Sequence, residues 1–128
     1  MTGSAPDVSA FTILEMLQQL GHDPALLSGA LGSVYEQVRP VSDGGFELWR
    51  DGTPYAWARC AGGLCAFDYW DHAPRVDAFA VQATMWAEAK VGPMQGAWPV
   101  RQASGAAAQL EITLGPGEVA IKLWTTQP

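Results

Sequence analysis

Two short turn sequences, Asp51-Gly52 and Gly62-Gly63, constrain the fold of this chain more than any other feature. Both are typical of two-residue β-hairpin turns, because aspartate and glycine tolerate the positive φ angles that such turns require. The flanking residues alternate in side-chain character, as residues of strands do. We therefore expect an antiparallel meander of three strands over residues 46–50, 53–60 and 65–70.

Each turn also predicts which residues of its hairpin lie opposite one another. The expected pairs are Phe46 with Trp57 and Leu48 with Tyr55 in the first hairpin, and Trp57 with Asp68 and Cys60 with Cys65 in the second. Successive side chains of a strand point to opposite faces of the sheet. One face is therefore expected to carry Trp49, Ala56, Ala58, Cys60, Cys65, Phe67 and Tyr69, and the other Phe46, Leu48, Tyr55, Trp57, Arg59, Ala66, Asp68 and Trp70. Both faces are apolar enough to need cover.

Three segments have the apolar spacing of amphipathic helices. The first covers residues 8–20, the second begins at Asp23-Pro24 and continues through Val38, and the third covers residues 76–90. Aspartate followed by proline is typical of a helix N-cap and first position. Glycines at 29 and 32 each cost about 1 kcal/mol inside the second helix, so that helix needs tertiary packing or breaks near residue 30.

The C-terminal part of the chain has the pattern of further strands. Residues 97–102 are expected to form a strand, which Pro99 restricts to the edge of a sheet. Apolar residues then alternate on both sides of residues 115–117, which predicts a last hairpin with Leu114 opposite Val119. The same register brings Glu111 opposite Lys122, a favourable pair of charges.

Together these segments predict a single α+β domain over residues 1–128. Its expected order is α-α-β-β-β-α-β-β-β, with a mainly antiparallel sheet and the helices packed on one face. Residues 1–7 are small and polar, and we expect them to be frayed. The residues expected to be most buried are Leu14, Leu17, Leu31, Val34, Phe67, Phe79, Ala83, Trp86, Ile112 and Ile121.

The charge of the chain argues against two classes of partner. It has 13 acidic residues and 7 basic ones, for a net charge of −6, and the basic residues are scattered. Nucleic acids and anionic membranes bind clustered Lys and Arg, so neither is expected as a partner, whereas acidic proteins favour basic partners. With no long apolar run and no secretory signal in residues 1–7, the expected location is cytoplasmic.

Cys60 and Cys65 are expected to lie opposite each other across the Gly62-Gly63 turn. Opposed residues of this kind have Cβ atoms about 4.5–5.5 Å apart, and a disulfide needs somewhat less, which local twist can supply. In a chain without a secretory signal, two reduced thiols in the core are the favoured interpretation. A redox pair stays open as an alternative, whereas the spacing does not fit a zinc site.

Asp68, Asp71, His72 and Asp77 stand close together in the sequence. A histidine with nearby carboxylates can act as an acid–base pair or bind a metal. Strand alternation, however, sends Asp68 and Asp71 to opposite faces, and Asp71 and Asp77 suit a loop and a helix start. Asp68 and His72 are kept as the candidates for catalysis, and no metal or cofactor is expected.

The candidate binding residues lie together on one of the two predicted sheet faces: Tyr55, Trp57, Arg59, Asp68 and Trp70. Tyr, Trp and Arg are enriched at protein interfaces. Arg59 and Asp68 lie diagonally across the strand pair, and we expect them to contact each other beside Trp57. The alternative is a second core layer covered by other elements, although 6 tryptophans are many for so small a core.

The order of two helices, three meandering strands and a helix resembles the fold of acyl-CoA N-acyltransferases. The segment FELWRDGTPYAWARC at residues 46–60 resembles the central hairpin of those proteins. The resemblance implies an acyltransferase-like enzyme. Those families carry a glycine-rich pyrophosphate loop between the third strand and the next helix, whereas residues 71–77 of this chain contain no glycine.

The expected function is that of a small acidic protein-binding module that uses the aromatic sheet face. It is of the inhibitor, immunity-protein or secretion-chaperone type, which would make it a bacterial or phage protein. The expected partner is a protein, with a small molecule as second choice and a homodimer left open. The enzyme alternatives are the acyltransferase and a small isomerase or cyclase on a curved sheet, whose closed pocket would hold Asp68 or His72 beside Trp57.

Overall fold

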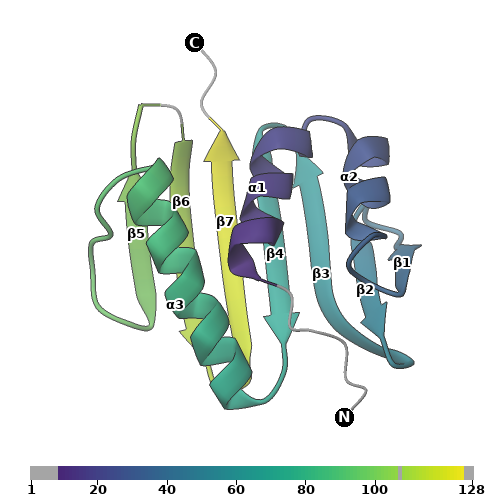
Figure 1. The fold of residues 1–128 in the computed structure, drawn as a ribbon. Coiled ribbons are helices and arrows are strands. Elements are labelled where there is room, and N and C mark those ends of the chain that lie inside the picture. The colour runs from purple at the N-terminus through teal and green to yellow at the C-terminus, as the bar shows by residue number, and fades with distance from the viewer. Residues whose placement is uncertain (1–8, 107, 126–128) are drawn as a thin grey trace.

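A computed structural model describes residues 9–106 and 108–125 of the chain, and within these ranges three helices lie on one face of a seven-stranded antiparallel sheet (Figure 1). The strands lie side by side in the order β1-β2-β3-β4-β7-β6-β5. In chain order the elements are α1 (Ala10–Leu20), α2 (Pro24–Leu31), β1 (Gln37–Pro40), β2 (Phe46–Arg50), β3 (Thr53–Ala61), β4 (Leu64–Trp70), α3 (Ala73–Lys90), β5 (Val100–Ser104), β6 (Ala108–Gly115) and β7 (Glu118–Thr125). The expected α+β class with helices on one sheet face is confirmed, and the expected order is met except for one additional strand, β1. The expected fraying of residues 1–7 lies outside the described residues.

The core fills the space between the helices and one face of the sheet. Figure 1 shows α3 in front of β6 and β7, α1 in front of β4 and α2 in front of β2. The strands contribute alternate residues to this core, among them Ala58 of β3, Phe67 of β4 and Ile121 of β7, all fully buried. Of the ten residues expected in the core, all but Val34 are buried. Val34 is half-buried because it lies in the turn that follows α2.

The two turns form as the sequence predicts, and they produce the meander of β2, β3 and β4. Asp51 and Gly52 have φ angles of 52° and 72°, and Gly62 and Gly63 have φ angles of 60° and 83°. Two successive residues with positive φ are typical of the hairpin turn whose twist matches that of the strands. The second hairpin has the expected register, with Trp57 opposite Asp68 and Cys60 opposite Cys65.

The predicted register of the first hairpin is wrong, because a β-bulge interrupts it. Leu48 lies opposite Ala56 but Trp49 lies opposite Pro54, so β3 contributes the extra residue Tyr55. Such an extra residue shifts the pairing on one side of the bulge by one position. Phe46 now lies opposite Ala58 instead of Trp57.

Because of the bulge, Phe46, Leu48 and Trp49 of β2 lie on the opposite faces of the sheet from those expected. Leu48 is fully buried under the helices, and Phe46 packs against the same core. Trp49, which was expected on the helix side, lies on the other face, where its ring contacts Arg39 and Glu47. Residues 46–50 were therefore identified correctly as a strand, but their side chains were assigned to the wrong faces.

Of the two outcomes expected for the second helix, the break near residue 30 is confirmed, because α2 ends at Leu31. The amide of Gly32 donates to the carbonyl of Ser28, and those of Ser33 and Tyr35 donate to the carbonyls of Ala30 and Leu31, which closes the helix. Glycine lowers the stability of a helix interior, and this helix has glycines at 29 and 32. The residues after the break instead form β1, which pairs with β2.

The remaining elements lie close to their predicted positions, although β5 covers Val100–Ser104 instead of residues 97–102 and so begins after Pro99. Ser9 and Asp23 cap α1 and α2 by accepting hydrogen bonds from backbone amides. In α3 the predicted core residues Phe79, Ala83 and Trp86 form part of the buried stripe, although the helix begins at residue 73 instead of 76. In the last hairpin Leu114 lies opposite Val119 and Glu111 opposite Lys122. None of the described helices is long and apolar enough to cross a membrane.

Candidate functional site

The face of the sheet that points away from the helices is called the open face here, because no described helix lies on it (Figure 1). Residues of β2, β3 and β4 gather four aromatic side chains on it. These form the aromatic cluster, which consists of Trp49, Tyr55, Trp57 and Trp70. Trp70 keeps 36% of its surface exposed and the other three are half-buried. The sequence left open whether other elements cover this face as a second core layer. Among the described residues, no helix forms such a layer over it.

Trp57 lies at the centre of this surface, in a row that crosses four strands. Glu47 of β2 is its neighbour on one side and Asp68 of β4 on the other, and Arg39 of β1 lies opposite Glu47. Directly opposed residues of an antiparallel pair share a face and have Cβ atoms about 4.5–5.5 Å apart. The indole of Trp57 is therefore flanked on both neighbouring strands by a carboxylate residue.

Two other indoles of the cluster donate hydrogen bonds to carboxylates. The Trp49 Nε1 donates to Glu47 Oε1 at 3.2 Å, and the Trp70 Nε1 donates to Glu118 Oε2 at 3.2 Å. The guanidinium of Arg39 lies 3.8 Å above the centroid of the Trp49 ring, a cation–π contact. These contacts orient the rings and bring negative charge to their edges.

The position of Trp57 depends on a glycine in the loop before β2. A Cβ atom on Gly45 would lie 2.8 Å from Trp57 Nε1 and 2.9 Å from the carbonyl oxygen of Ala58. Real Cβ atoms do not approach other heavy atoms so closely. Residue 45 therefore has to be glycine for the indole of Trp57 to pack against the backbone of this loop.

Asp68 is a half-buried carboxylate without an ion pair among the described residues. Burial raises the pKa of Asp68, the negative charge of Glu118 raises it further, and the positive charge of Lys122 partly opposes both. The contact expected between Arg59 and Asp68 is not formed. Arg59 lies opposite Ala66 and points its charge into solvent. The five predicted binding residues thus share the open face, but Arg59 does not neutralise Asp68.

The residues kept as candidates for catalysis do not meet. Asp68 is on the open face, whereas His72 is the exposed N-cap residue of α3 and makes no side-chain capping bond. Between them, Asp71 accepts hydrogen bonds from the Tyr69 hydroxyl at 2.6 Å and from the His72 amide at 2.7 Å, and it lies 3.6 Å from Arg75. Asp71 therefore joins β4 to α3. No described group of three or more His, Cys, Asp or Glu side chains could hold a metal ion.

The lowered pKa of Asp71 fits this structural role. Burial acts to raise the pKa of Asp71, but the hydrogen bonds from Tyr69 and the His72 amide and the charge of Arg75 outweigh it, so the pKa is lowered. The side chain is only 5% exposed. Asp71 therefore stays ionised and bound, rather than being free to exchange protons with a substrate.

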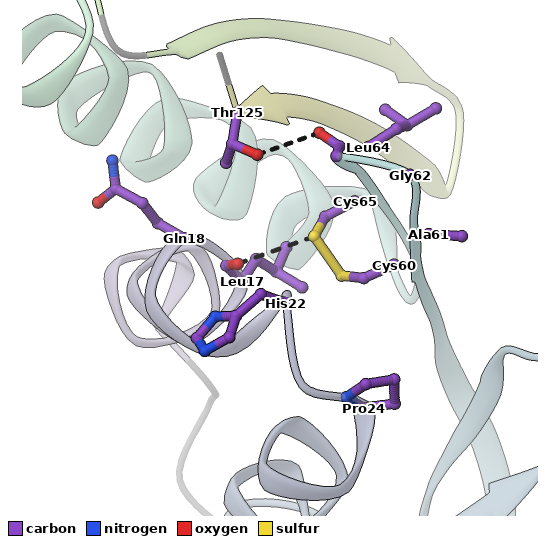
Figure 2. Close-up of a pocket in the computed structure, with 12 residues that line it drawn as sticks. Leu17, Gln18, His22, Pro24, Cys60, Ala61, Gly62, Leu64, Cys65 and Thr125 are labelled. Atoms are coloured by element: carbon purple, nitrogen blue, oxygen red, sulfur yellow. Dashed lines mark hydrogen bonds between the residues drawn. A yellow bond between two sulfur atoms is a disulfide. The ribbon is translucent and has the colours of Figure 1, made fainter. Parts of the chain in front are cut away.

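A cavity of about 620 Å³ lies away from the open face, between the end of α1 and the turn from β3 to β4 (Figure 2). Cys60 and Cys65 form part of its wall and are joined in a disulfide, with Cα atoms 4.1 Å apart. The favoured interpretation of two reduced thiols is therefore wrong. Sequence reasoning placed the two cysteines opposite each other but could not show that Gly21 and His22 lie beside them.

Comparison with known proteins finds no matching family model, no matching curated protein and no matching solved structure, so the function has to be argued from the site itself.

Proposed function

We propose that this protein is a small binding module whose open face holds a basic segment of a protein partner. The observation that carries the proposal is the aromatic cluster, which lies exposed or half-exposed on a sheet face and is interleaved with carboxylates. Large aromatic side chains and arginine supply much of the binding energy at protein interfaces. Large apolar patches on a protein surface often mark a binding site.

The sheet supplies this surface in a rigid form. Trp57 and Asp68 belong to neighbouring paired strands, and Trp70 is anchored through Glu118 of the next strand. Side chains held on a paired sheet lose little conformational freedom when a partner binds, which leaves more of the contact energy for affinity. The Gly45 contact with Trp57 restrains the central ring in the same way.

The charges of the surface favour a basic occupant. Glu47, Asp68 and Glu118 bring three carboxylates to the rings of Trp57 and Trp70. The described cations on the same face are Arg39, stacked within the cluster, and Arg59 and Lys122 beside it. A guanidinium or ammonium group is attracted both by an indole face and by a carboxylate beside it. Asp68 has the most to gain, because a nearby cation offsets the cost of burying its charge, which raises its pKa.

The net charge of the chain supports the same occupant at longer range. With a net charge of −6, the protein attracts a positively charged partner before contact and repels acidic ones. Inhibitors, immunity proteins and secretion chaperones act by binding a partner in this stoichiometric way, and we assign the protein to that class. The expected cytoplasmic location stays a prediction, which cell fractionation with an antibody tests.

The enzyme alternative finds no support in the geometry of the cavity. A pocket enzyme was expected to hold Asp68 or His72 beside Trp57. The cavity of about 620 Å³ is lined by none of these residues. The binding proposal therefore leads over the isomerase, cyclase and acyltransferase alternatives.

The proposal is tested with short peptides of defined charge. The ¹⁵N-labelled protein is titrated with a peptide of alternating glycine and arginine, and separately with its glycine–lysine and glycine–glutamate counterparts. We expect the arginine peptide to shift the indole resonances of Trp57 and Trp70 and the amides of β3 and β4, and the glutamate peptide to shift neither. Shifts confined to the helix side, or equal shifts with both peptides, would contradict the proposal.

Matched variants distinguish a loss of binding at the open face from a loss of folding. Asp68→Asn is expected to weaken binding of the arginine peptide about two- to fivefold, and Trp57→Ala to weaken it more. Glu88→Gln removes a carboxylate from the exposed side of α3, and Trp98→Ala removes an exposed indole far from the cluster, so both serve as controls. Thermal unfolding of each variant checks that lost binding does not come from lost folding. If Trp57→Ala and Arg59→Ala both bind normally, the open face is not the binding surface.

A further inference from the structure

The disulfide between Cys60 and Cys65 lies on the wall of a cavity large enough for a small molecule. The cavity is formed by the end of α1, the turn before α2, the turn between β3 and β4, and the end of β7 (Figure 2). Its volume of about 620 Å³ is within the range of natural ligand sites. A disulfide buried in a core is protected from exchange, whereas a small thiol can reach one that borders a cavity.

The two cysteine residues are not equally exposed. Cys65 is 4% exposed and its Sγ lies 3.7 Å from the carbonyl oxygen of Leu17, whereas Cys60 is only half-buried. Thiol–disulfide exchange depends on which sulfur an attacking thiolate can reach. Attack from the cavity is therefore directed to Cys60, and Cys65 is the sulfur that leaves.

The hairpin does not depend on the disulfide to hold its strands together. Six residue pairs join β3 to β4, from Ala56 opposite Tyr69 to Ala61 opposite Leu64. The amide and the hydroxyl of Thr125 both donate to the carbonyl of Gly63, at 2.9 and 3.3 Å, and attach this turn to β7. Reduction therefore leaves the two thiols opposite each other, in position to form the bond again.

A hydrogen-bond acceptor is also available for the thiol of reduced Cys65. Once reduced, Cys65 carries an S–H group, and the carbonyl oxygen of Leu17 is already positioned to accept a hydrogen bond from it. A buried thiol that has an acceptor does not lose the energy of an unsatisfied polar group. Both the oxidised and the reduced pair are thus accommodated by the same surroundings.

Gly21, the C-cap of α1, connects the pair to the helices. A Cβ atom on Gly21 would lie 3.2 Å from Cys60 Sγ and would collide with Cys65 Sγ and the Leu17 carbonyl. Reduction moves the sulfurs from a bond of about 2.05 Å to van der Waals separation. Since the space beside Gly21 has no room for a Cβ atom, we expect this movement to affect the corner between α1 and α2.

We propose that Cys60 and Cys65 form a reversible thiol–disulfide site that exchanges with a low-molecular-weight thiol in this cavity. The thiolate of the small molecule attacks Cys60 Sγ, the bond between the cysteines breaks, and its electron pair goes to Cys65 Sγ, which takes a proton from water. A second small thiolate attacks the mixed disulfide, so that Cys60 leaves as a thiolate and the small molecule is released as its own disulfide. Two thiols are oxidised to one disulfide as the protein disulfide is reduced. The site does not involve the aromatic cluster, so it stands independently of the proposed binding function.

The first test measures exchange in the folded full-length protein. The chain is equilibrated with mixtures of reduced and oxidised glutathione, free thiols are alkylated, and the oxidised fraction is measured by mass spectrometry. We expect native protein to interconvert fully in both directions, with a reduction rate proportional to glutathione thiolate. If reduction occurs only in denaturant, or if the rate does not depend on glutathione, the disulfide is a structural one and the proposal is wrong.

The second test uses a matched pair of variants to examine the direction of attack. Cys65→Ser leaves the accessible Cys60 as a single thiol, and Cys60→Ser leaves the buried Cys65. With glutathione disulfide, Cys60 is expected to form a mixed disulfide about tenfold faster than Cys65 or more. Circular dichroism checks that both variants are folded. Equal rates, or a faster reaction at Cys65, would overturn the assignment.

The third test examines the coupling to α1. Hydrogen exchange of the oxidised and reduced wild-type protein is compared by mass spectrometry. Faster exchange on reduction is expected at residues 18–24 and not at residues 73–90 of α3. Unchanged exchange at residues 18–24 would show that reduction of the disulfide does not affect the end of α1.

Discussion

Trp86 Nε1 donates a hydrogen bond to Glu15 Oε1 at 2.9 Å, and this bond joins α3 to α1 on the helix side of the sheet. The Lys90 ammonium lies 2.9 Å from the same oxygen, and Gln19 Nε2 donates to Oε2 at 2.8 Å. Trp86 is among the largest fully buried side chains, so the bond satisfies the one polar atom of its ring. A single carboxylate therefore links the two helices through both Trp86 and Lys90.

We expect Glu15→Gln to destabilise the protein in a pH-dependent way. The hydrogen bonds from Lys90 and from Trp86 hold the pKa of Glu15 below its ordinary value, although burial opposes them. A lowered pKa contributes stability that is present above the ordinary value of 4.5 and is lost as the pH falls through the lower value of the folded protein.

Because the carboxylate is partly exposed, the expected loss at neutral pH is about 0.5–1 kcal/mol. Urea unfolding of both proteins at neutral pH and below pH 4 measures it. The difference should shrink in acid, and Glu88→Gln is the control. A difference that does not change with pH would contradict the role of the charge.

Truncation of the core should be costly where the helices meet the sheet. Phe79 of α3 packs against Phe67 and Tyr69, with ring centroids 5.7 and 5.0 Å away, and Ile112 of β6 is fully buried. Phe79→Ala and Ile112→Ala are each expected to cost about 2–5 kcal/mol. Val81→Ala, on the exposed side of the same helix, should change stability by less than about 0.5 kcal/mol. Urea unfolding that gives less than 1 kcal/mol for both core variants would contradict the packing.

Gly29→Ala should stabilise the protein. Gly29 lies within α2 and is exposed, and a Cβ atom added to it would meet no atom of another element within 4 Å. Alanine in the interior of a helix is more favourable than glycine by about 0.5–1 kcal/mol, mainly because it restricts the unfolded chain. Thermal and urea unfolding should both report the gain. A loss of stability would mean that the exposed side of α2 has a role that its surroundings do not reveal.

Gly45→Ala tests the packing of Trp57 without changing any charge. The added methyl group would meet Trp57 Nε1 and the Ala58 carbonyl at less than 3.0 Å, so the ring has to move. Overpacking of this kind costs about 1–3 kcal/mol. We expect lower stability, a change in tryptophan fluorescence and weaker binding of the arginine peptide. Gly29→Ala, which adds the same group in open space, is the matched control, and an unchanged Trp57 signal would contradict the contact.

The local parts of the fold follow from short stretches of sequence. Asp51-Gly52 and Gly62-Gly63 determine their turns because few other residues adopt successive positive φ angles. The last hairpin is specified twice, by the alternation that places Leu114 opposite Val119 and by the charges of Glu111 and Lys122. Where two independent local signals agree, the register could be predicted from the sequence.

The errors occur where a distant contact decides between local alternatives. Residues after Leu31 fit a helical stripe, but β2 offers an unpaired edge, and residues 37–40 form β1 there. The bulge at Tyr55 brings Leu48 under the helices and Trp49 to the open face. Neither a bulge nor an available strand edge leaves a regular pattern in the sequence, because both depend on how elements far apart in the chain pack.

The sequence by itself determined the turns, the meander, the buried stripe of α3 and the residues of β3 and β4 that share a face with Trp57, but not the faces of Phe46, Leu48 and Trp49 in β2. Those features depend on backbone preferences and on the alternation of neighbouring side chains, which act over a few residues. Only the tertiary structure decided that all the described helices cover the side of Phe67 and leave the side of Trp57 open, and that Gly21 lies against the disulfide. Both sides of the sheet are apolar enough to attract helices, so the side that stays uncovered depends on packing across the whole chain.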